Sequence, residues 1–239
     1  EPALALCDAA LLGELRAAQP RVARMVSFNS PAAAGTLEAL SESKSGEFHA
    51  CDTLATDIAL LAFTSGTTGV PKAAVHTHRD ILAACETWPR HVLQMGTQDI
   101  VVGTPPLAFT FGLGGLLVFP MWAGASVYFP DAPYTPESMV AAINTVGASI
   151  CYSAPTFYRQ MAPVAKAKGV PSLRTSVSAG EGLPSATRTV WREATGLQMV
   201  DGIGATEMFH IFISSAGAQV KPDAIGQVVP GYQAKVVDD

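Results

Sequence analysis

Short strand-like runs alternate with longer helix-like runs along most of this chain, and this alternation limits the folds that it can adopt. Short runs such as 149–152 and 175–178, each between helix-like segments, are typical of strands, whereas 185–195 lies between a proline and a glycine, as helices often do. Such alternation with short loops predicts an α/β fold with a largely parallel sheet and flanking helices. The predicted strands are 23–28, 58–63, 73–76, 99–103, 125–129, 149–152, 175–178, 197–200 and 233–237, and the predicted helices are 11–15, 80–93, 112–121, 137–145, 155–167 and 185–195, with a further short helix in the surface loop 31–51.

The loops that follow these strands are the first place to look for a site, because ligands of parallel sheets bind at the carboxyl ends of the strands. Four such loops carry glycine together with polar or aromatic residues. They read "TSGTTG" at 64–69, "PPLAFTFG" at 105–112, "SAGEGL" at 178–183 and "DGIGATE" at 201–207.

Composition excludes several classes of function. The chain is 49% hydrophobic and 15% charged, with a net charge of −5. Its scattered basic residues do not favour a nucleic-acid partner. The apolar stretch 113–129 is interrupted by glycine and proline, so we expect no membrane span. The four cysteines lie far apart without a C-x-x-C pair, which favours reduced, buried thiols in a cytoplasmic protein.

The loop after residue 63 has the composition of a phosphate-binding loop. It offers four hydroxyl side chains, two glycines whose backbone N–H groups can approach a ligand closely, and Lys72 as a counter-charge. It is not a Walker A loop, because Lys72 leads into the apolar run 73–75 and not into a helix. The predicted loop therefore lies between two strands, the first of them buried, without a helix dipole behind it. An ordinary glycine- and threonine-rich hairpin connection is the alternative.

Four motifs in order give the chain a family resemblance. "FTSGTTGVPK" at 63–72 resembles the phosphate-binding signature of acyl-adenylate-forming (AMP-binding) enzymes. "SAGEGLP" at 178–184 resembles their adenine loop, "DGIGATE" at 201–207 their aromatic-Gly-x-Thr-Glu motif, and "GQVVPG" at 226–231 a later strand-turn segment. Within this family, "PPLAFTFGLGG" and "DGIGATEMFHIFISS" are most similar to benzoate- and 2-aminobenzoate-CoA ligases.

The resemblance implies a reaction and a set of roles. ATP and an aromatic carboxylate would form an acyl-adenylate, and coenzyme A would then displace AMP. Glu207 would bind Mg²⁺, and Thr206 would form a hydrogen bond with the α-phosphate. Asp201 would accept a hydrogen bond from the adenine amino group. Ile203 replaces the aromatic residue that many relatives stack on adenine. The implied catalytic residues are Lys72, Thr206 and Glu207, and the implied nucleotide-binding residues are Thr64, Ser65, Gly66, Thr67, Thr68, Gly69, Gly180, Glu181, Asp201, Gly202 and Ile203.

The resemblance also implies a flat, apolar acyl pocket, as aromatic acids require. Its residues would be Phe109, Thr110, Phe111, Gly204, His210 and Ile211. A solvated carboxylate is the alternative for Glu181, and a core residue is the alternative for Phe111 and for His210. His76 and His78 could be metal ligands, but no third ligand is apparent, so packing and helix capping are favoured.

Two other functions remain open. An amino-acid adenylation domain would need an acidic residue near Thr110, and none occurs between Pro105 and Gly115. A nucleotide-binding module without catalysis would need no more than the motifs present. We expect the chain to be a fragment of the AMP-binding N-terminal domain, inactive alone, with the start of that domain and the C-terminal domain as its missing partners. Apolar faces left uncovered would favour a homo-oligomer.

Overall fold

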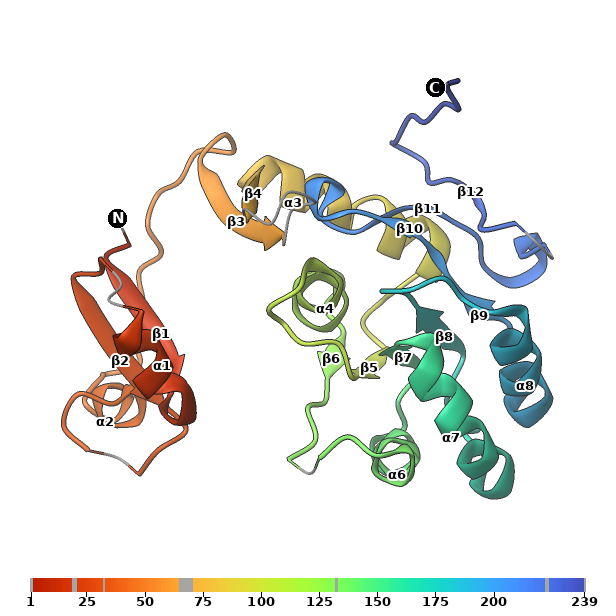
Figure 1. The fold of residues 1–239 in the computed structure, drawn as a ribbon, viewed down its shortest axis with the longest axis horizontal. Coiled ribbons are helices and arrows are strands. Elements are labelled where there is room, and N and C mark those ends of the chain that lie inside the picture. The colour runs from red at the N-terminus through yellow and green to blue at the C-terminus, as the bar shows by residue number, and fades with distance from the viewer. Residues whose placement is uncertain are drawn as a thin grey trace. The chain divides into compact units, whose positions relative to one another are not determined.

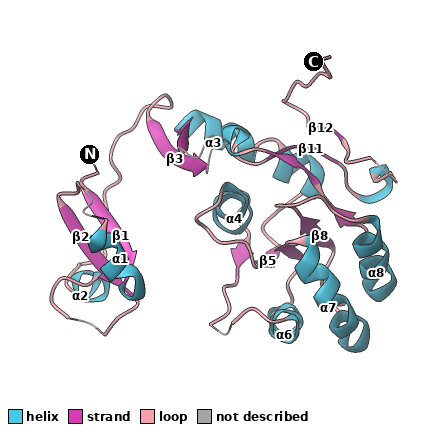
Figure 2. Ribbon diagram, viewed as in Figure 1, coloured by secondary structure: helices cyan, strands magenta, loops and turns pink. Residues whose placement is uncertain are grey.

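The computed structural model describes residues 2–18, 21–31, 33–64, 71–131, 133–221 and 224–238 (Figure 1). The chain divides into two compact units, Glu1–Asp52 and Thr53–Asp239, which we describe separately. Figure 2 distinguishes their helices and strands by colour.

The first unit is a small parallel β-sheet with helices. Strands β1 (Leu4–Asp8) and β2 (Arg24–Phe28) pair in parallel, and the elements between and after them are η1 (Ala9–Leu11), α1 (Leu12–Ala17) and α2 (Leu37–Glu42). The predicted strand 23–28 and the predicted short helix in 31–51 are therefore present. Strand β1 was not predicted, because its residues continue the alanine- and leucine-rich composition of the helix that follows.

The second unit begins with the hairpin that carries the candidate phosphate loop. Strands β3 (Ile58–Thr64) and β4 (Lys72–Thr77) are antiparallel, with Thr64 opposite Lys72. The connecting residues 65–70 lie outside the described residues. The prediction that 58–63 is buried is wrong, since Ile58 is 63% and Phe63 is 68% exposed. Only the other face packs inward, through Leu60 and His76.

Helix α3 (His78–Cys85) starts two residues earlier than predicted. Its N-cap is Thr77 and not His78: Thr77 Oγ1 accepts from Asp80 N–H at 3.3 Å, and the Asp80 carboxylate accepts from Thr77 N–H at 2.8 Å. The predicted continuous helix 80–93 is interrupted before Pro89, which lacks an N–H group, and resumes as a π-helical turn, η2 (Pro89–Leu93).

A five-stranded parallel sheet forms the centre of the second unit and confirms the predicted fold class. The strand order is β6 (Ser126–Val127), β5 (Ile100–Gly103), β7 (Ile150–Ser153), β8 (Thr175–Ser178) and β9 (Met199–Val200). All four neighbouring pairs are parallel. The carboxyl ends of these strands therefore meet at one edge.

Helices cover both faces of this sheet (Figures 1 and 2). Successive strand residues face opposite sides. Cys151 accordingly joins the buried cluster that includes Met139 and Trp191, and Tyr152 joins the cluster that includes Trp88 and Phe119. The first face is covered by α6 (Pro136–Val146), α7 (Pro155–Lys168) and α8 (Ser185–Thr195), and the second by α3, η2 and the helical run α4 (Thr110–Leu113), η3 (Gly114–Val118) and α5 (Phe119–Ala123).

A second, antiparallel sheet follows β9 and was not predicted as a sheet, although a strand-turn segment was expected at 226–231, where its last strand lies. It consists of β10 (Gly202–Gly204), β11 (Ile211–Ser214) and β12 (Gln227–Val228), in that order. Its first strand starts two residues after β9 ends, so it extends from the carboxyl edge of the parallel sheet. The predicted strand 233–237 is wrong: these residues adopt no regular structure, and Val236 is fully solvent-exposed.

The four cysteines are free thiols. Cys85 and Cys151 are buried as predicted, whereas Cys51 is exposed and Cys7 is partly exposed. Across the described part of the chain, no helix combines the length and apolar character that a membrane span requires.

Candidate functional site

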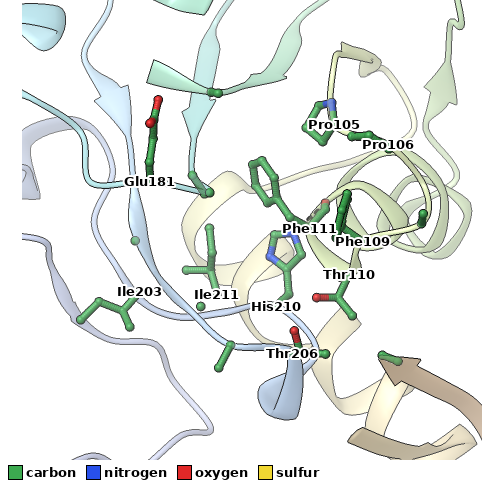
Figure 3. A pocket seen from close by; sticks show the side chains of 18 of the residues that line it. Pro105, Pro106, Phe109, Thr110, Phe111, Glu181, Ile203, Thr206, His210 and Ile211 are labelled. Carbon is green, nitrogen blue, oxygen red and sulfur yellow. Dashed lines mark hydrogen bonds between the residues drawn. The ribbon is translucent and has the colours of Figure 1, made fainter. Parts of the chain in front are cut away.

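A cavity of about 750 Å³ opens at the carboxyl edge of the parallel sheet (Figure 3). It is formed by the loops after β5, β7 and β8, by the start of α4, and by β10 and β11. The lining residues are Ala62, Phe63, Thr104, Pro105, Pro106, Ala108, Phe109, Thr110, Phe111, Ala154, Ala179, Gly180, Glu181, Gly182, Gly202, Ile203, Gly204, Ala205, Thr206, His210, Ile211 and Ile225. The cavity thus brings together all six residues predicted for the acyl pocket.

One wall of the cavity is the loop 105–109, which is held against the helix that follows it. Gly112 approaches this loop so closely that a Cβ atom there would lie 2.2 Å from the Pro106 carbonyl oxygen. The Phe109 N–H group also donates to that oxygen at 3.2 Å. Glycine at 112 therefore allows the loop to fold onto α4, with Thr110 at its first turn facing the cavity.

His210 forms part of the cavity floor within a cluster of aromatic rings. Its ring centroid lies 4.7 Å from that of Phe119, 4.9 Å from that of Trp88 and 5.4 Å from that of Phe111. Nε2 lies 3.2 Å from the Phe111 carbonyl oxygen, and since that oxygen only accepts, Nε2 carries the proton. Both interpretations weighed for His210 therefore apply, because it is a core residue that also lines the cavity.

Burial lowers the pKa of His210 to about 3, and the hydrogen bond to Phe111 offsets this only in part. His210 is therefore neutral at physiological pH and cannot act as the counter-charge of a bound carboxylate. Its Nδ1 atom is buried and has no hydrogen-bond partner among the described residues. Phe111 shares both roles, since it lines the cavity and packs against Tyr152 with ring centroids 5.7 Å apart.

Of the three predicted catalytic residues, one lines the main cavity and two do not. Thr206 lines the cavity and is partly buried, at the start of the 3₁₀ turn η4 (Thr206–Met208). Glu207 and Lys72 are exposed and do not line the cavity.

The predicted phosphate-loop residues Ser65, Gly66, Thr67, Thr68 and Gly69 lie outside the described residues. No group of three His, Cys, Asp or Glu side chains that could hold a metal ion occurs in the described ranges.

The predicted adenine-pocket residues divide between two adjoining cavities. Gly180, Glu181 and Ile203 line the main cavity. Asp201 lines the second, of about 620 Å³, which shares Glu181, Gly182, Gly202 and Ile225 with the first. Glu181 is exposed, and its carboxylate accepts from the Thr156 N–H group at 3.3 Å.

An arginine that was not predicted holds the Asp201 side chain. Arg188 of α8 donates to the Asp201 carboxylate at 3.1 Å and to the Met199 carbonyl oxygen at 2.8 Å. Burial nevertheless raises the pKa of Asp201, because the nearby Arg188 charge compensates only part of the lost hydration. The Asp201 carboxylate therefore lines the second cavity with one charged donor, Arg188, already bound to it.

Three further lining residues could have been found from the strand order. Thr104, Ala154 and Ala179 each come directly after a strand, β5, β7 and β8 respectively. The carboxyl-end rule alone assigns them to the site. Phe63 ends the predicted strand 58–63 and begins the motif at 63–72, whereas no comparable signal marks Ile225.

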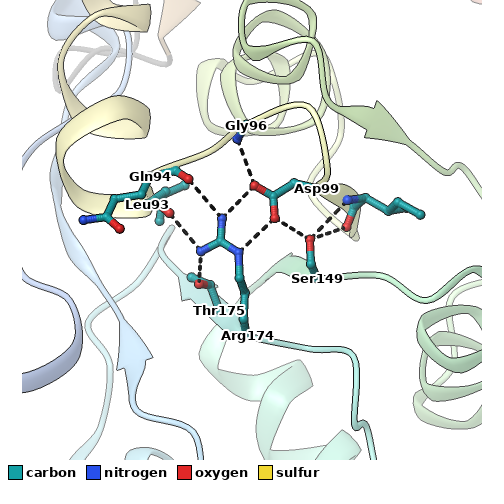
Figure 4. A network of polar contacts seen from close by, with 8 residues as sticks. Leu93, Gln94, Gly96, Asp99, Ser149, Arg174 and Thr175 are labelled. Atoms are coloured by element: carbon teal, nitrogen blue, oxygen red, sulfur yellow. Dashed lines mark hydrogen bonds and ion pairs between the residues drawn. The ribbon is translucent and has the colours of Figure 1, made fainter.

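A second arginine–aspartate pair lies at the amino ends of the same strands (Figure 4). The Asp99 carboxylate accepts from Arg174 Nε and Nη2 at 2.8 and 2.7 Å, from Ser149 Oγ at 2.7 Å and from Gly96 N–H at 2.9 Å. Burial would raise the pKa of Asp99, but these hydrogen bonds and the Arg174 charge outweigh it and hold the pKa below its ordinary value. This pair joins β5, β7 and β8 at the edge away from the cavity.

Comparison with known proteins identifies what this arrangement resembles. Residues 1–239 match the protein family described as AMP-binding enzyme. The chain is 34% identical to benzoate–CoA ligase of Thauera aromatica, over 85% of its own length and 39% of that protein. It is 33% identical to anthranilate–CoA ligase of Pseudomonas aeruginosa, over 74% of its length and 34% of the relative.

Solved structures give the same result. The anthranilate CoA ligase AuaEII in complex with anthranoyl-AMP superposes with a TM-score of 0.87 at 35% identity, over 99% of this chain and 47% of that one. A benzoate CoA ligase from Burkholderia xenovorans LB400 gives a TM-score of 0.83 at 27% identity, over 97% of this chain and 46% of that one. The chain thus spans less than half the length of each of these four proteins.

Proposed function

The chain belongs to the family of AMP-binding enzymes, and we propose that it is part of a ligase that activates an aromatic carboxylate of the benzoate or 2-aminobenzoate type with ATP and transfers the acyl group to coenzyme A. In this proposal the chain is a segment of the N-terminal domain of a longer protein. The similarity to benzoate– and anthranilate–CoA ligases supports the substrate class.

The observation that carries the proposal is the chemistry of the main cavity. Phe109, Phe111, Ile211 and the neutral His210 line it, and Glu181 is the sole carboxylate among its described lining residues. An apolar cavity lined by aromatic rings favours an aromatic substrate. An amino acid would need an acidic partner for its ammonium group near Thr110, where the described wall has none.

The proposed roles follow the order of the motifs along the chain. Lys72 and the residues 64–69 would hold the β- and γ-phosphates, and Thr206 would donate to the α-phosphate. Gly180, Glu181, Gly202 and Ile203 would enclose the adenine, with Asp201 accepting from its amino group. Glu207 would hold Mg²⁺ together with phosphate oxygens, and the ion would neutralise phosphate charge when bound.

The proposed chemistry is two displacements. A carboxylate oxygen of the acid attacks the α-phosphorus, a new P–O bond forms, and the bond to the leaving pyrophosphate breaks. The sulfur of coenzyme A then attacks the acyl carbon, so that a C–S bond forms, AMP leaves, and the thiol proton passes to solvent. Fixed donors such as Lys72 and Thr206 would act by stabilising charge that develops on the phosphate oxygens.

Pyrophosphate exchange by the full-length protein that contains this chain tests the proposal. We expect exchange with benzoate or 2-aminobenzoate and little with octanoate or phenylalanine, followed by thioester formation when coenzyme A is added. Exchange that is fastest with phenylalanine would favour an amino-acid adenylation domain. ATP binding without exchange for any acid would favour a nucleotide-binding module.

A further inference from the structure

His76 connects two segments of the proposed nucleotide site that are far apart in the sequence. It lies near the end of β4, the strand that begins with Lys72, and it is 3% exposed. Its Nε2 atom lies 2.7 Å from the carbonyl oxygen of Thr206, at the start of η4. Because a carbonyl oxygen only accepts, Nε2 is the protonated nitrogen.

The turn that His76 contacts ends in an unfavourable backbone conformation. Phe209 directly follows η4 with φ of +66°, in a region that residues with a side chain rarely adopt. Such a conformation persists only where the surroundings hold it. Phe209 is buried, and its ring meets the edge of the His76 ring with centroids 5.6 Å apart and the edge of Phe119 at 6.0 Å.

The backbone of this turn also determines where its two functional side chains lie. The Thr206 oxygen accepts from the Phe209 N–H group at 3.1 Å as well as from His76, and the Met208 N–H group donates to Ala205 at 3.0 Å. Among the described residues, neither the Thr206 hydroxyl nor the Glu207 carboxylate has a hydrogen-bond partner of its own. Their positions therefore depend on the turn.

We propose that His76 is a positioning residue for nucleotide binding: its hydrogen bond to Thr206 and its ring contact with Phe209 fix the turn that presents Thr206 and Glu207, and tie that turn to the strand that carries Lys72. This inference rests on the proposed function. His76 does not line either cavity and does not act on the substrate itself. A leucine would fill the same space, so packing alone does not account for the polar contact.

The test is a double-mutant cycle in the full-length protein, read out as the dissociation constant of Mg²⁺-ATP measured by calorimetry without any acid present. We expect His76→Leu to weaken ATP binding about tenfold, the effect of one net hydrogen bond. In a Thr206→Ala background the same change should weaken binding by a clearly smaller factor than in the unmodified protein, since one of the two side chains that His76 positions is already gone. The KM for the aromatic acid should not change.

Two further variants separate positioning from folding. His76→Gln keeps an N–H donor at the same reach, though not the ring, and should retain more ATP affinity than the shorter His76→Asn. Val75→Ala is the matched control, because Val75 is the neighbouring β4 residue and its side chain is exposed. This control should bind ATP as the unmodified protein does. If His76→Leu fails to fold, the comparison of His76→Gln with His76→Asn decides.

Equal weakening by His76→Leu with and without the Thr206 hydroxyl would overturn the inference, as would equal ATP affinity of the Gln and Asn variants. An unmodified protein that binds ATP but adenylates no aromatic acid would refute the proposed substrate class while leaving this comparison measurable. An unmodified protein that does not bind ATP would overturn both.

Discussion

The two aspartate–arginine pairs of the second unit should respond oppositely to the same substitution. Asp99→Asn and Asp201→Asn each replace a carboxylate by an amide of the same shape, at opposite edges of one sheet. The Asp99 side chain is 9% exposed and accepts four hydrogen bonds of 2.7–2.9 Å, two of them from the charged Arg174. An amide would direct N–H groups at some of these donors.

The magnitude follows from the number and burial of these bonds. Breaking a buried ion pair costs about 3–5 kcal/mol, and Arg174 is 40% exposed, so water recovers part of the loss. We therefore expect Asp99→Asn to lower the free energy of unfolding by about 2–4 kcal/mol, or the melting temperature by roughly 5–15 °C. Asp201→Asn should leave stability unchanged or raise it by up to about 1 kcal/mol, because burial disfavours the Asp201 charge and the amide oxygen still accepts from Arg188.

The free energy of unfolding should depend on pH in opposite directions for the two aspartates. The pKa of Asp99 is held below its ordinary 3.8, so its contribution to stability is present above that pH and is lost as pH falls through the folded-state pKa. The pKa of Asp201 is raised above 3.8, so its unfavourable contribution develops as pH rises from 3.8 through the folded-state pKa. The loss caused by Asp99→Asn should therefore be full at pH 7 and should shrink only as pH falls below 3.8, whereas any gain from Asp201→Asn should shrink as pH falls towards 3.8.

Chemical and thermal unfolding of the 239-residue chain, followed by tryptophan fluorescence, measures these differences. Trp88, Trp122 and Trp191 all lie in the second unit, so the signal reports that unit. Asp131→Asn, at an exposed position, supplies the baseline. Equal losses for Asp99→Asn and Asp201→Asn, or a larger loss for Asp201→Asn, would refute the reasoning.

Three further predictions concern the site. In the full-length protein, Lys72→Ala should reduce kcat/KM for ATP by roughly 10–100-fold through loss of charged hydrogen bonds to phosphate; steady-state kinetics equal to those of the unmodified protein would contradict this role. Thr110→Tyr should exclude ring-substituted acids before benzoate, because overpacking a narrow slot is unfavourable; pyrophosphate exchange across a substituted series checks the order. Burial lowers the pKa of His210 from 6.5 to about 3, so the folded protein should lose stability as pH falls from 6.5 towards 3. His210→Phe should reduce that slope by up to about 1.4 kcal/mol per pH unit in unfolding experiments, and an unchanged slope would contradict the burial argument.

Local sequence signals were sufficient for the parallel sheet and its helices. Strand β8 and helix α8 have the predicted bounds, 175–178 and 185–195, because Pro184 and Gly196 mark the helix ends and Gly196 adopts φ of +77° there. Such signals depend on a few neighbouring residues and on backbone geometry.

Features set by distant partners were not predictable in the same way. Strands β10 and β12 are two to three residues long, and β10 contains two glycines, so neither shows the alternation of a strand. They exist because β11 pairs with both. The exposure of 58–63 has the same origin, because an apolar run shows that a strand can be buried but not whether a second layer is present to bury it.

The position of a residue relative to a strand helps to predict its role, beyond what the residue type alone predicts. Asp99 and Asp201 are the same residue with the same kind of partner, yet Asp99 directly precedes β5 and Asp201 directly follows β9. In a parallel sheet the first position lies at the amino edge, where a carboxylate can join strands, and the second lies at the carboxyl edge, where it faces ligands. Their opposite pKa shifts agree with this division. Residue type and strand order together therefore distinguish structural carboxylates from candidate functional ones. They do not predict the contact of His76 with Thr206, which lies 130 residues away in the sequence.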